Sequence, residues 1–305
     1  MMKKLLEEAI DSCREYSKDG RVANYIPELA KADPNEFGVA VVSEEGIEFA
    51  GDYNKKFTMQ SVVKPVILLM ALLDNGEERV RSLVGVEATG KPFDAFNYSD
   101  QALNSEHINP MINTGAIALC TLIKGKSYDE KFERLLDLTR RLADDESLSV
   151  DDAVYLSEKA TGNKNRALAY MLKAYKMIDD DAEEILDVYF RACSIKVDCI
   201  ALAKIAYVLA NRGKSAKTGE QLIPPEYARC INAVLVTSGM YDGSGEFAWN
   251  VGIPAKSGVG GGIMAVVPRR MGLGLYSPAL DKKGNSLPAV KALNFLSKKL
   301  ELSIF

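Results

Sequence analysis

A serine and a lysine stand three residues apart at the start of an apolar segment, in the stretch FTMQSVVKPVILLM (57–70). Because residues i and i+3 are neighbours on a helix, the amine of Lys64 can reach the hydroxyl group of Ser61. Burial or a nearby cation lowers the pKa of a lysine, and its neutral amine can then take the proton of the serine. The pair therefore predicts nucleophilic catalysis by Ser61 with Lys64 as base, a mechanism that needs no histidine.

The sequence holds a single histidine, His107. A zinc protease site of the type H-E-x-x-H needs two histidines, and a serine–histidine triad could use only His107. We interpret His107, in NSEHINPM (104–111), as a residue of a loop or a helix end. The Ser61–Lys64 pair is therefore the better candidate for catalysis.

A second motif lies near the other end of the chain, in PAKSGVGGG (254–262). Enzymes of the β-lactamase and penicillin-binding superfamily place K-S-G and a strand beside their S-x-x-K helix. There the lysine, here Lys256, supplies positive charge, and the strand edge supplies a backbone N–H for an oxyanion hole. The glycines of 258–262 do not fit G-x-G-x-x-G, because Ile263 takes the final glycine position. We interpret them as a strand whose backbone approaches another element closely.

Strand patterns lie at both ends of the sequence, and helical patterns fill the middle. Strands are predicted at 37–43 and 46–51, which form a hairpin, and at 261–268 and 271–278. Helical patterns cover 2–18, most of 114–237 and 287–300. Short turns between strands favour an antiparallel sheet over a doubly wound parallel one. We therefore expect an α+β fold, with an antiparallel sheet built from N- and C-terminal segments, flanking helices and an inserted helical subdomain.

The clearest helix is DCIALAKIAYVLANRG (198–213), where Asp198 is expected to cap the N-terminus and Gly213 to follow the C-terminus. We expect one catalytic domain over 1–305. Within this domain, residues 1–64 and 238–305 are expected to form the part that contains the sheet. Residues 65–237 are expected to form a mainly helical part.

Composition and charge argue against two other classes of protein. The formal net charge is −4, whereas a nucleic-acid-binding protein normally shows a basic stripe. There is no secretory apolar segment and no run of 18 apolar residues, so we expect a cytoplasmic protein that binds neither membrane nor nucleic acid. The five cysteines are scattered and form no C-x-x-C pair, which favours reduced thiols.

Together with their neighbours, these motifs resemble the serine-dependent glutaminases of the bacterial type. The resemblance covers nearly the whole chain in order, through GRVANYIPELA (20–30), FTMQSVVK (57–64), NPMINTGAI (109–117), EKATGNKNRALAY (158–170), DVYFRACSIKV (187–197), TSGMYDGSGEFAWNVGIPAKSGVGGGIMAVVP (237–268) and SPALDKKGNS (277–286). The block at 237–268 is highly specific for that family. The resemblance implies a β-lactamase-like fold and hydrolysis of L-glutamine to L-glutamate and ammonia through a glutamyl-serine intermediate.

The resemblance also implies catalytic roles for particular residues. Ser61 would be the nucleophile and Lys64 its base, while Tyr241 would relay protons, including one to the departing ammonia. Tyr25 would belong to the same catalytic group, lining the pocket near the Ser–Lys pair. The N–H groups of Ser61 and Val259 would form the oxyanion hole.

By the same resemblance, the substrate contacts would be Asn113, Glu158, Asn165, Tyr189, Tyr241 and Val259. The carboxylate of Glu158 suits the ammonium group of glutamine, and uncharged amide and hydroxyl groups suit its other polar ends. Ammonia leaves readily only when protonated, so a general acid is needed. We expect Lys64 and Lys256 to stabilise the Tyr241 phenolate and to bring its pKa into a useful range.

The resemblance implies no metal and no organic cofactor, and the family commonly forms dimers or tetramers, so we expect a homo-oligomer. Two departures are small: Thr114 stands where the family usually has alanine, and S-V-V-K replaces S-I-S-K. Three alternatives stay open. They are an enzyme acylated by β-lactams or D,D-peptides, a non-catalytic amino-acid-binding or scaffold protein, and an amidohydrolase that prefers asparagine.

Overall fold

Five strands form one antiparallel sheet in the order β2-β1-β7-β6-β5. They are β1 (Gly38–Ser43), β2 (Gly46–Gly51), β5 (Ala255–Ser257), β6 (Gly262–Val267) and β7 (Met271–Tyr276). The structure, a computed structural model, describes residues 1–89 and 105–305. The N- and C-terminal segments meet where β1 pairs with β7, with Gly38 opposite Tyr276 and Ser43 opposite Met271. The predicted α+β class and the antiparallel sheet built from N- and C-terminal segments are confirmed, whereas β5 lies outside the predicted strand ranges.

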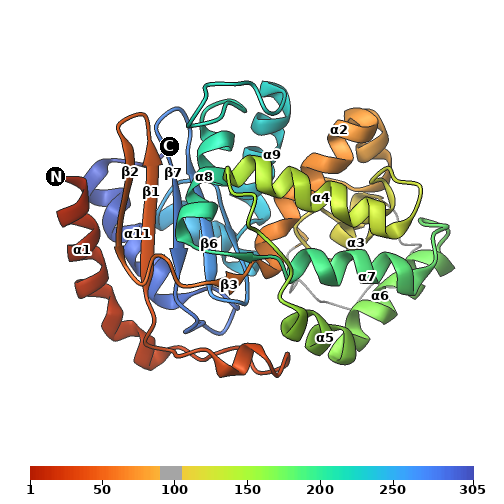
Figure 1. Cartoon of the computed structure of the whole chain (residues 1–305), viewed down its shortest axis with the longest axis horizontal. Coiled ribbons are helices and arrows are strands. Elements are labelled where there is room, and N and C mark those ends of the chain that lie inside the picture. The colour runs from red at the N-terminus through yellow and green to blue at the C-terminus, as the bar shows by residue number, and fades with distance from the viewer. Residues whose placement is uncertain (90–104) are drawn as a thin grey trace.

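Helices cover both faces of this sheet (Figure 1). α1 (Met2–Cys13) and α11 (Leu287–Leu300) lie on one face, and α8 (Cys199–Ala210) lies on the other. Side chains of β1 alternate between the two sides, as the period of a strand requires. Val39 and Val41 join the apolar cluster of α1 and α11, whereas Ala40 and Val42 join that of α8. The central strands are therefore buried on both faces.

α8 approaches β7 closely because β7 carries two glycines, in MGLGLY. A Cβ atom at Gly272 would lie 2.2 Å from the carbonyl oxygen of Ala203, and one at Gly274 would lie 2.1 Å from that of Cys199. The start of α8 is capped as predicted, since the side chain of Asp198 accepts a hydrogen bond from the N–H of Ala201 at 2.9 Å.

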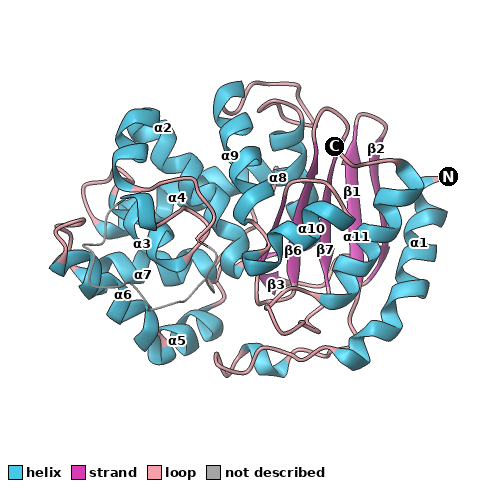
Figure 2. Ribbon diagram, turned by 180° about the vertical axis from the view of Figure 1, so that it is seen from behind, coloured by secondary structure: helices cyan, strands magenta, loops and turns pink. Residues whose placement is uncertain are grey.

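The remaining helices form a second group beside the sheet, seen from behind in Figure 2. They are α2 (Lys64–Leu83), α3 (Asn113–Thr121), α4 (Tyr128–Ala143), α5 (Asp152–Thr161), α6 (Asn163–Ala174) and α7 (Ala182–Cys193). α9 (Pro225–Ser238) contacts both α2 and β5, and α10 (Ser244–Asn250) packs on α9. A short antiparallel pair, β3 (Phe57–Thr58) with β4 (Lys196–Val197), lies where the two groups meet.

Two predicted helices have different starts or ends in the structure. α1 ends at Cys13, and a 3₁₀ turn over Arg14–Asp19 completes the predicted segment 2–18. Ser61 precedes α2, because a 3₁₀ turn over Gln60–Val63 comes before the helix begins at Lys64. Such tight turns are common at helix ends, and apolar periodicity does not distinguish them from helix.

The predicted helical part, 65–237, includes a helix that packs on the sheet. α8 lies within 65–237 but packs on the sheet, and that range also includes residues 90–104, which lie outside the described residues. One continuous apolar cluster joins the helical group to the α8 face of the sheet. Within residues 1–89 and 105–305, no helix combines the length and the apolar character needed to cross a bilayer.

Candidate active site

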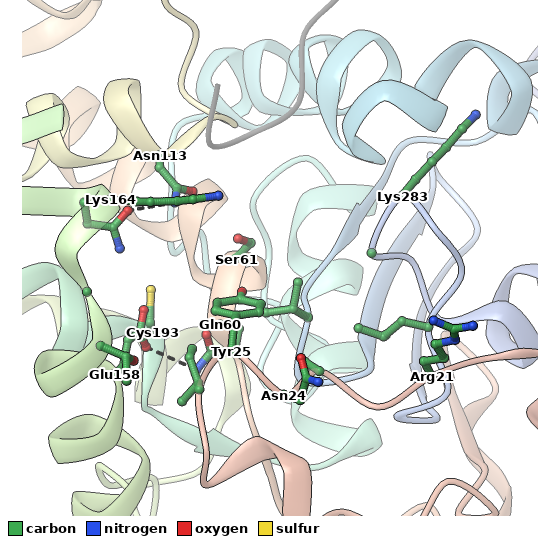
Figure 3. A pocket seen from close by; sticks show the side chains of 18 of the residues that line it. Arg21, Asn24, Tyr25, Gln60, Ser61, Asn113, Glu158, Lys164, Cys193 and Lys283 are labelled. Carbon is green, nitrogen blue, oxygen red and sulfur yellow. Dashed lines mark hydrogen bonds between the residues drawn. The ribbon is translucent and has the colours of Figure 1, made fainter. Parts of the chain in front are cut away.

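Ser61 lies in the 3₁₀ turn before α2, and its side chain lines a cavity of about 680 Å³ (Figure 3). The residue before it, Gln60, has a φ of 49°, in the left-handed region that non-glycine residues seldom adopt. Gln60 is also buried, so the surrounding packing holds this conformation. Strained backbone of this kind is concentrated at functional sites, which agrees with a role for Ser61.

Lys64 follows one turn after Ser61, and its side chain is fully buried. Its Nζ donates a hydrogen bond to Oδ1 of Asn113 at 2.6 Å and to the carbonyl oxygen of Met111 at 3.3 Å. Both acceptors are uncharged. Lys64 therefore sits behind the cavity wall and reaches the cavity through Asn113, which lines it.

Lys256, on β5, is a second fully buried lysine. Its Nζ donates to the carbonyl oxygens of Gly239 at 3.0 Å and Ser257 at 2.7 Å, and it lies 4.3 Å from the ring centroid of Tyr241. Burial, and next the positive charge of Lys64, lower the pKa of Lys256 well below its usual range. The two motifs of the sequence, S-x-x-K and K-S-G, are thus brought within electrostatic reach of each other.

Tyr241 begins a short 3₁₀ turn and also has a left-handed backbone, with a φ of 56°. Its phenol is buried and has the Ser61 side chain as a hydrogen-bond partner. Burial raises the pKa of Tyr241, and the hydrogen bond with Ser61 opposes this only in part. The expectation that neighbouring lysines bring this pKa down is therefore wrong for the ligand-free site. The phenol keeps its proton, as a general acid must before the reaction.

A glycine-rich turn joins β5 to β6 and packs against the serine turn. A Cβ atom at Gly258 would lie 2.6 Å from the carbonyl oxygen of Met59, and one at Gly260 would lie 2.7 Å from that of Thr58. The predicted close approach of 258–262 is confirmed, although these residues form a turn and β6 begins only at Gly262. Val259 lies in this turn and lines the cavity. No backbone carbonyl of the described residues accepts a hydrogen bond from its N–H.

Three uncharged polar side chains meet at one side of the cavity. Nδ2 of Asn113 donates to Oδ1 of Asn165 at 2.9 Å, and the hydroxyl of Tyr189 donates to Oδ1 of Asn113 at 3.4 Å. All three residues are buried and all line the cavity. They come from α3, α6 and α7, so tertiary packing alone brings them together.

Glu158, on α5, is buried in the same wall and accepts a hydrogen bond from Nε2 of Gln60 at 3.3 Å. Burial raises the pKa of Glu158 to about 8, against the smaller opposing effects of the Gln60 hydrogen bond and the Lys64 charge. A carboxyl group with no bound cation and a raised pKa is suited to a cationic ligand, because the ligand charge would favour its ionised form.

The cavity brings together most of the predicted site residues, and three lie just behind it. Its wall includes Ser61, Tyr25, Asn113, Glu158, Asn165, Tyr189 and Val259. Lys64, Tyr241 and Lys256 do not line this cavity. Lys64 contacts Asn113, Tyr241 contacts Ser61, and Lys256 lies against the Tyr241 ring. Tyr25 differs from the others in being half-exposed at 53%.

Sequence reasoning did not select several other residues of this cavity. Gln60 lies within the block FTMQSVVK, and its buried contact with Glu158 joins two segments that are 98 residues apart. Arg21, Lys282 and Lys283 lie within or beside quoted blocks, but surface cations give no signal of their own in a sequence. Within the part of the chain that the structure describes, no group of His, Cys, Asp and Glu side chains could hold a metal ion.

The chain is similar to known proteins over most or all of its length. A family model described as glutaminase matches residues 20–305. The chain is 51% identical to a glutaminase of Clostridium tetani over 306 residues, covering 100% of both chains. It is 48% identical to glutaminase 2 of Clostridium perfringens over 305 residues, again covering 100% of both.

The fold of the chain is similar to the folds of solved protein structures. The Bacillus subtilis glutaminase YbgJ, in a covalent complex with 5-oxo-L-norleucine formed by reaction with 6-diazo-5-oxo-L-norleucine, superposes with a TM-score of 0.92. It is 35% identical, and the match covers 100% of each chain. The protein Mglu, in its tris and glutamate form, gives a TM-score of 0.94 at 38% identity, covering 99% of this chain and 67% of that one.

Proposed function

The chain belongs to the glutaminase family of enzymes, and we propose that it hydrolyses L-glutamine to L-glutamate and ammonia through a glutamyl ester on Ser61. The observation that carries this proposal is the position of Ser61, in a cavity wall between Glu158 and the buried Lys64–Tyr241–Lys256 group. The covalent adduct that the related Bacillus subtilis enzyme forms with 6-diazo-5-oxo-L-norleucine supports a nucleophile in this family.

In the proposed complex, the ammonium group of glutamine pairs with the carboxylate of Glu158. The amides of Asn113 and Asn165 and the hydroxyl of Tyr189 bind its carboxylate or its amide carbonyl. These groups are already hydrogen-bonded to one another, which limits the entropy lost when the substrate is ordered. A buried polar wall of this kind disfavours analogues that lack the matching groups.

Acylation begins when Lys64 takes the proton of Ser61 and Oγ attacks the side-chain amide carbon. The N–H groups of Ser61 and Val259 stabilise the negative charge that develops on the carbonyl oxygen. Tyr241 donates its proton to the nitrogen, which leaves as ammonia. The negative charge of the resulting phenolate favours the protonated form of Lys256, whose Nζ lies 4.3 Å from the Tyr241 ring and which in that form stabilises the phenolate. Water then attacks the ester carbon, the Tyr241 phenolate takes a proton from this water, and Lys64 returns its proton to Oγ of Ser61. We expect Tyr25 to lie beside the reacting groups in this step.

The resemblance of both motifs to the β-lactamase and penicillin-binding superfamily also supports a β-lactamase-like assignment of the fold. On this view the chain is one catalytic domain with a sheet part and a mainly helical part. Assembly as a dimer or tetramer is a further part of the proposal.

The test is release of ammonia and glutamate from L-glutamine by the purified chain, with L-asparagine in parallel. We expect release from glutamine, lower release from asparagine, and loss of both activities in Ser61→Ala. Release from asparagine alone would change the substrate. No release from either amide, together with labelling by a fluorescent penicillin, would favour the β-lactam-acylated alternative.

A further inference from the structure

The hydroxyl group of Ser244 lies at the base of the turn that carries Tyr241. Its Oγ donates a hydrogen bond to the carbonyl oxygen of Tyr241 at 2.8 Å and accepts one from the N–H of Met240 at 3.0 Å. Ser244 is the first residue of α10, and its side chain is buried. This one hydroxyl group therefore links backbone groups on the two sides of the Tyr241 Cα atom.

The backbone of Tyr241 needs such a link, because its φ of 56° is one that a tyrosine seldom adopts. A conformation of this kind persists only where surrounding contacts hold it in place. Relaxation to the ordinary right-handed region would change φ by about 120°. That rotation would redirect the Cα–Cβ bond of Tyr241 and would take the phenol away from Ser61.

Packing does not enclose the Tyr241 turn on every side. Tyr241 and Ser244 both line a second cavity of about 180 Å³, together with Thr237 and Gly245. The turn therefore has space into which it could shift. Another side chain, Asn285, bonds to this segment, but its Nδ2 donates to the carbonyl of Met240 at the longer distance of 3.3 Å. The Ser244 hydroxyl group is thus the closer constraint on the turn.

We propose that Ser244 is a positioning residue for the reaction, and that its hydroxyl group holds the left-handed backbone of Tyr241 and so keeps the phenol directed at Ser61. This inference rests on the proposed role of Tyr241 as proton donor. Ser244 does not line the cavity that contains Ser61, so it has no contact with the bound substrate. Its loss should therefore affect the protonation of the leaving group, and substrate binding should be little changed.

A change of leaving group separates proton donation from other effects of a substitution. L-Glutamine releases ammonia, which needs a proton, whereas the γ-(S-methyl) thioester of L-glutamate releases methanethiolate, which leaves without one. For both substrates, kcat/KM reports the steps up to and including acylation. We expect Ser244→Ala to lower kcat/KM about tenfold or more for glutamine and about threefold or less for the thioester. For glutamine, the loss should be in kcat, with KM little changed.

Two further variants show whether the hydroxyl group acts through Tyr241. Tyr241→Phe should give the same selective loss on glutamine, and a larger one. Adding Ser244→Ala to Tyr241→Phe should lower kcat/KM for glutamine by only about twofold or less, because residues that act as a unit are not additive. Ser244→Thr keeps the hydroxyl group, so its kcat/KM for glutamine should stay within about threefold of the unchanged chain.

Ser297→Ala is the matched control. Ser297 is 6% exposed and Ser244 is 5% exposed, and Oγ of Ser297 donates to the carbonyl of Val251 at 2.6 Å, just after α10. The same atoms are removed at a similar depth, so thermal unfolding should report similar losses of stability. The control should keep its kcat/KM for both substrates.

Two results would overturn the role of Ser244 while leaving the proposed hydrolysis in place. They are a near-normal kcat/KM for glutamine in Ser244→Ala, and equal losses on glutamine and the thioester. A full additional loss from Ser244→Ala in the Tyr241→Phe background would also overturn it, because the hydroxyl group would then act independently of the phenol. A near-normal rate on glutamine in Tyr241→Phe would instead refute the proton donor, and this inference with it.

Discussion

Glu158 and Tyr241 are two titratable residues of the proposed site, and burial raises the pKa of both. Sequence blocks identified both residues as parts of the site. They did not predict the direction of the Tyr241 shift, because that depends on how completely the phenol is removed from water. Lysine neighbours can be inferred from motifs, whereas desolvation comes from packing by segments far apart in the chain.

Glu158 should make substrate capture depend on pH. In the ligand-free protein its carboxyl is mostly protonated below a pKa of about 8, and only the carboxylate pairs with the ammonium group of glutamine. We therefore expect kcat/KM for L-glutamine to rise as the pH rises towards 8. The measurement is kcat/KM from pH 6 to 9, and a profile that is flat over this range would contradict the assignment.

The same shift makes a prediction about stability. Between the ordinary pKa of 4.5 and about 8, the unfolded chain has lost the Glu158 proton and the folded chain keeps it. The folding stability of the ligand-free protein therefore falls as the pH rises through this window. Glu158→Gln should stabilise the protein by on the order of 4 kcal/mol at pH 8 and by little at pH 4.5. Urea unfolding at both pH values measures this, and equal effects at the two would contradict it.

Tyr241→Phe should lower kcat about 10²–10⁴-fold, the usual contribution of a general acid. The ring and its contact with Lys256 remain, so the fold should be unchanged. Ammonia release and circular dichroism measure the two effects. A near-normal rate in a folded variant would exclude Tyr241 as the proton donor.

At the scale of elements, the turn between β5 and β6 is the part that positions the proposed oxyanion hole. Gly258→Ala would place a methyl group 2.6 Å from the Met59 carbonyl, so the turn must move away from Ser61. We expect kcat to fall at least tenfold with little change in KM, because the lost contact is made mainly in the transition state. Steady-state kinetics with L-glutamine measures both constants.

Gly245→Ala is the matched control for that substitution. Gly245 is an exposed residue of α10, and nothing lies within 4 Å of a Cβ atom built there. Its replacement should leave kcat unchanged and stabilise the helix slightly. If the two variants lowered kcat equally, the close approach of Gly258 to the serine turn would not be the cause.

Regular elements were well predicted from the sequence, and the functional turns were less so. The β1–β2 hairpin, the cap at Asp198 and the span of α11 follow from alternation, capping residues and helical periodicity. The 3₁₀ turn at Gln60–Val63 and the left-handed backbone at Gln60 and Tyr241 do not. Tertiary packing around the site imposes this turn and these two backbone conformations, although the residues concerned do not favour them locally.

At the scale of the whole molecule, the two groups of helices and strands share one apolar core. Its cluster includes Val66 and Leu69 of α2, Leu202 of α8, and Met264 and Val266 of β6. Unfolding either part alone would expose this shared surface to water. We therefore expect a single cooperative unfolding transition, with coincident calorimetric and circular dichroism curves. Two resolved transitions would show instead that the helical part folds independently.

Covalent labelling at Ser61 tests the central claim most directly. The chain and its Ser61→Ala variant would each be treated with 6-diazo-5-oxo-L-norleucine, digested and mapped by mass spectrometry. The account predicts one adduct, on the peptide that contains Ser61, and none in the variant. Cys193 lines the same cavity and is the informative competitor. An adduct on Cys193, or labelling that persists in Ser61→Ala, would contradict the assignment of Ser61 as the nucleophile.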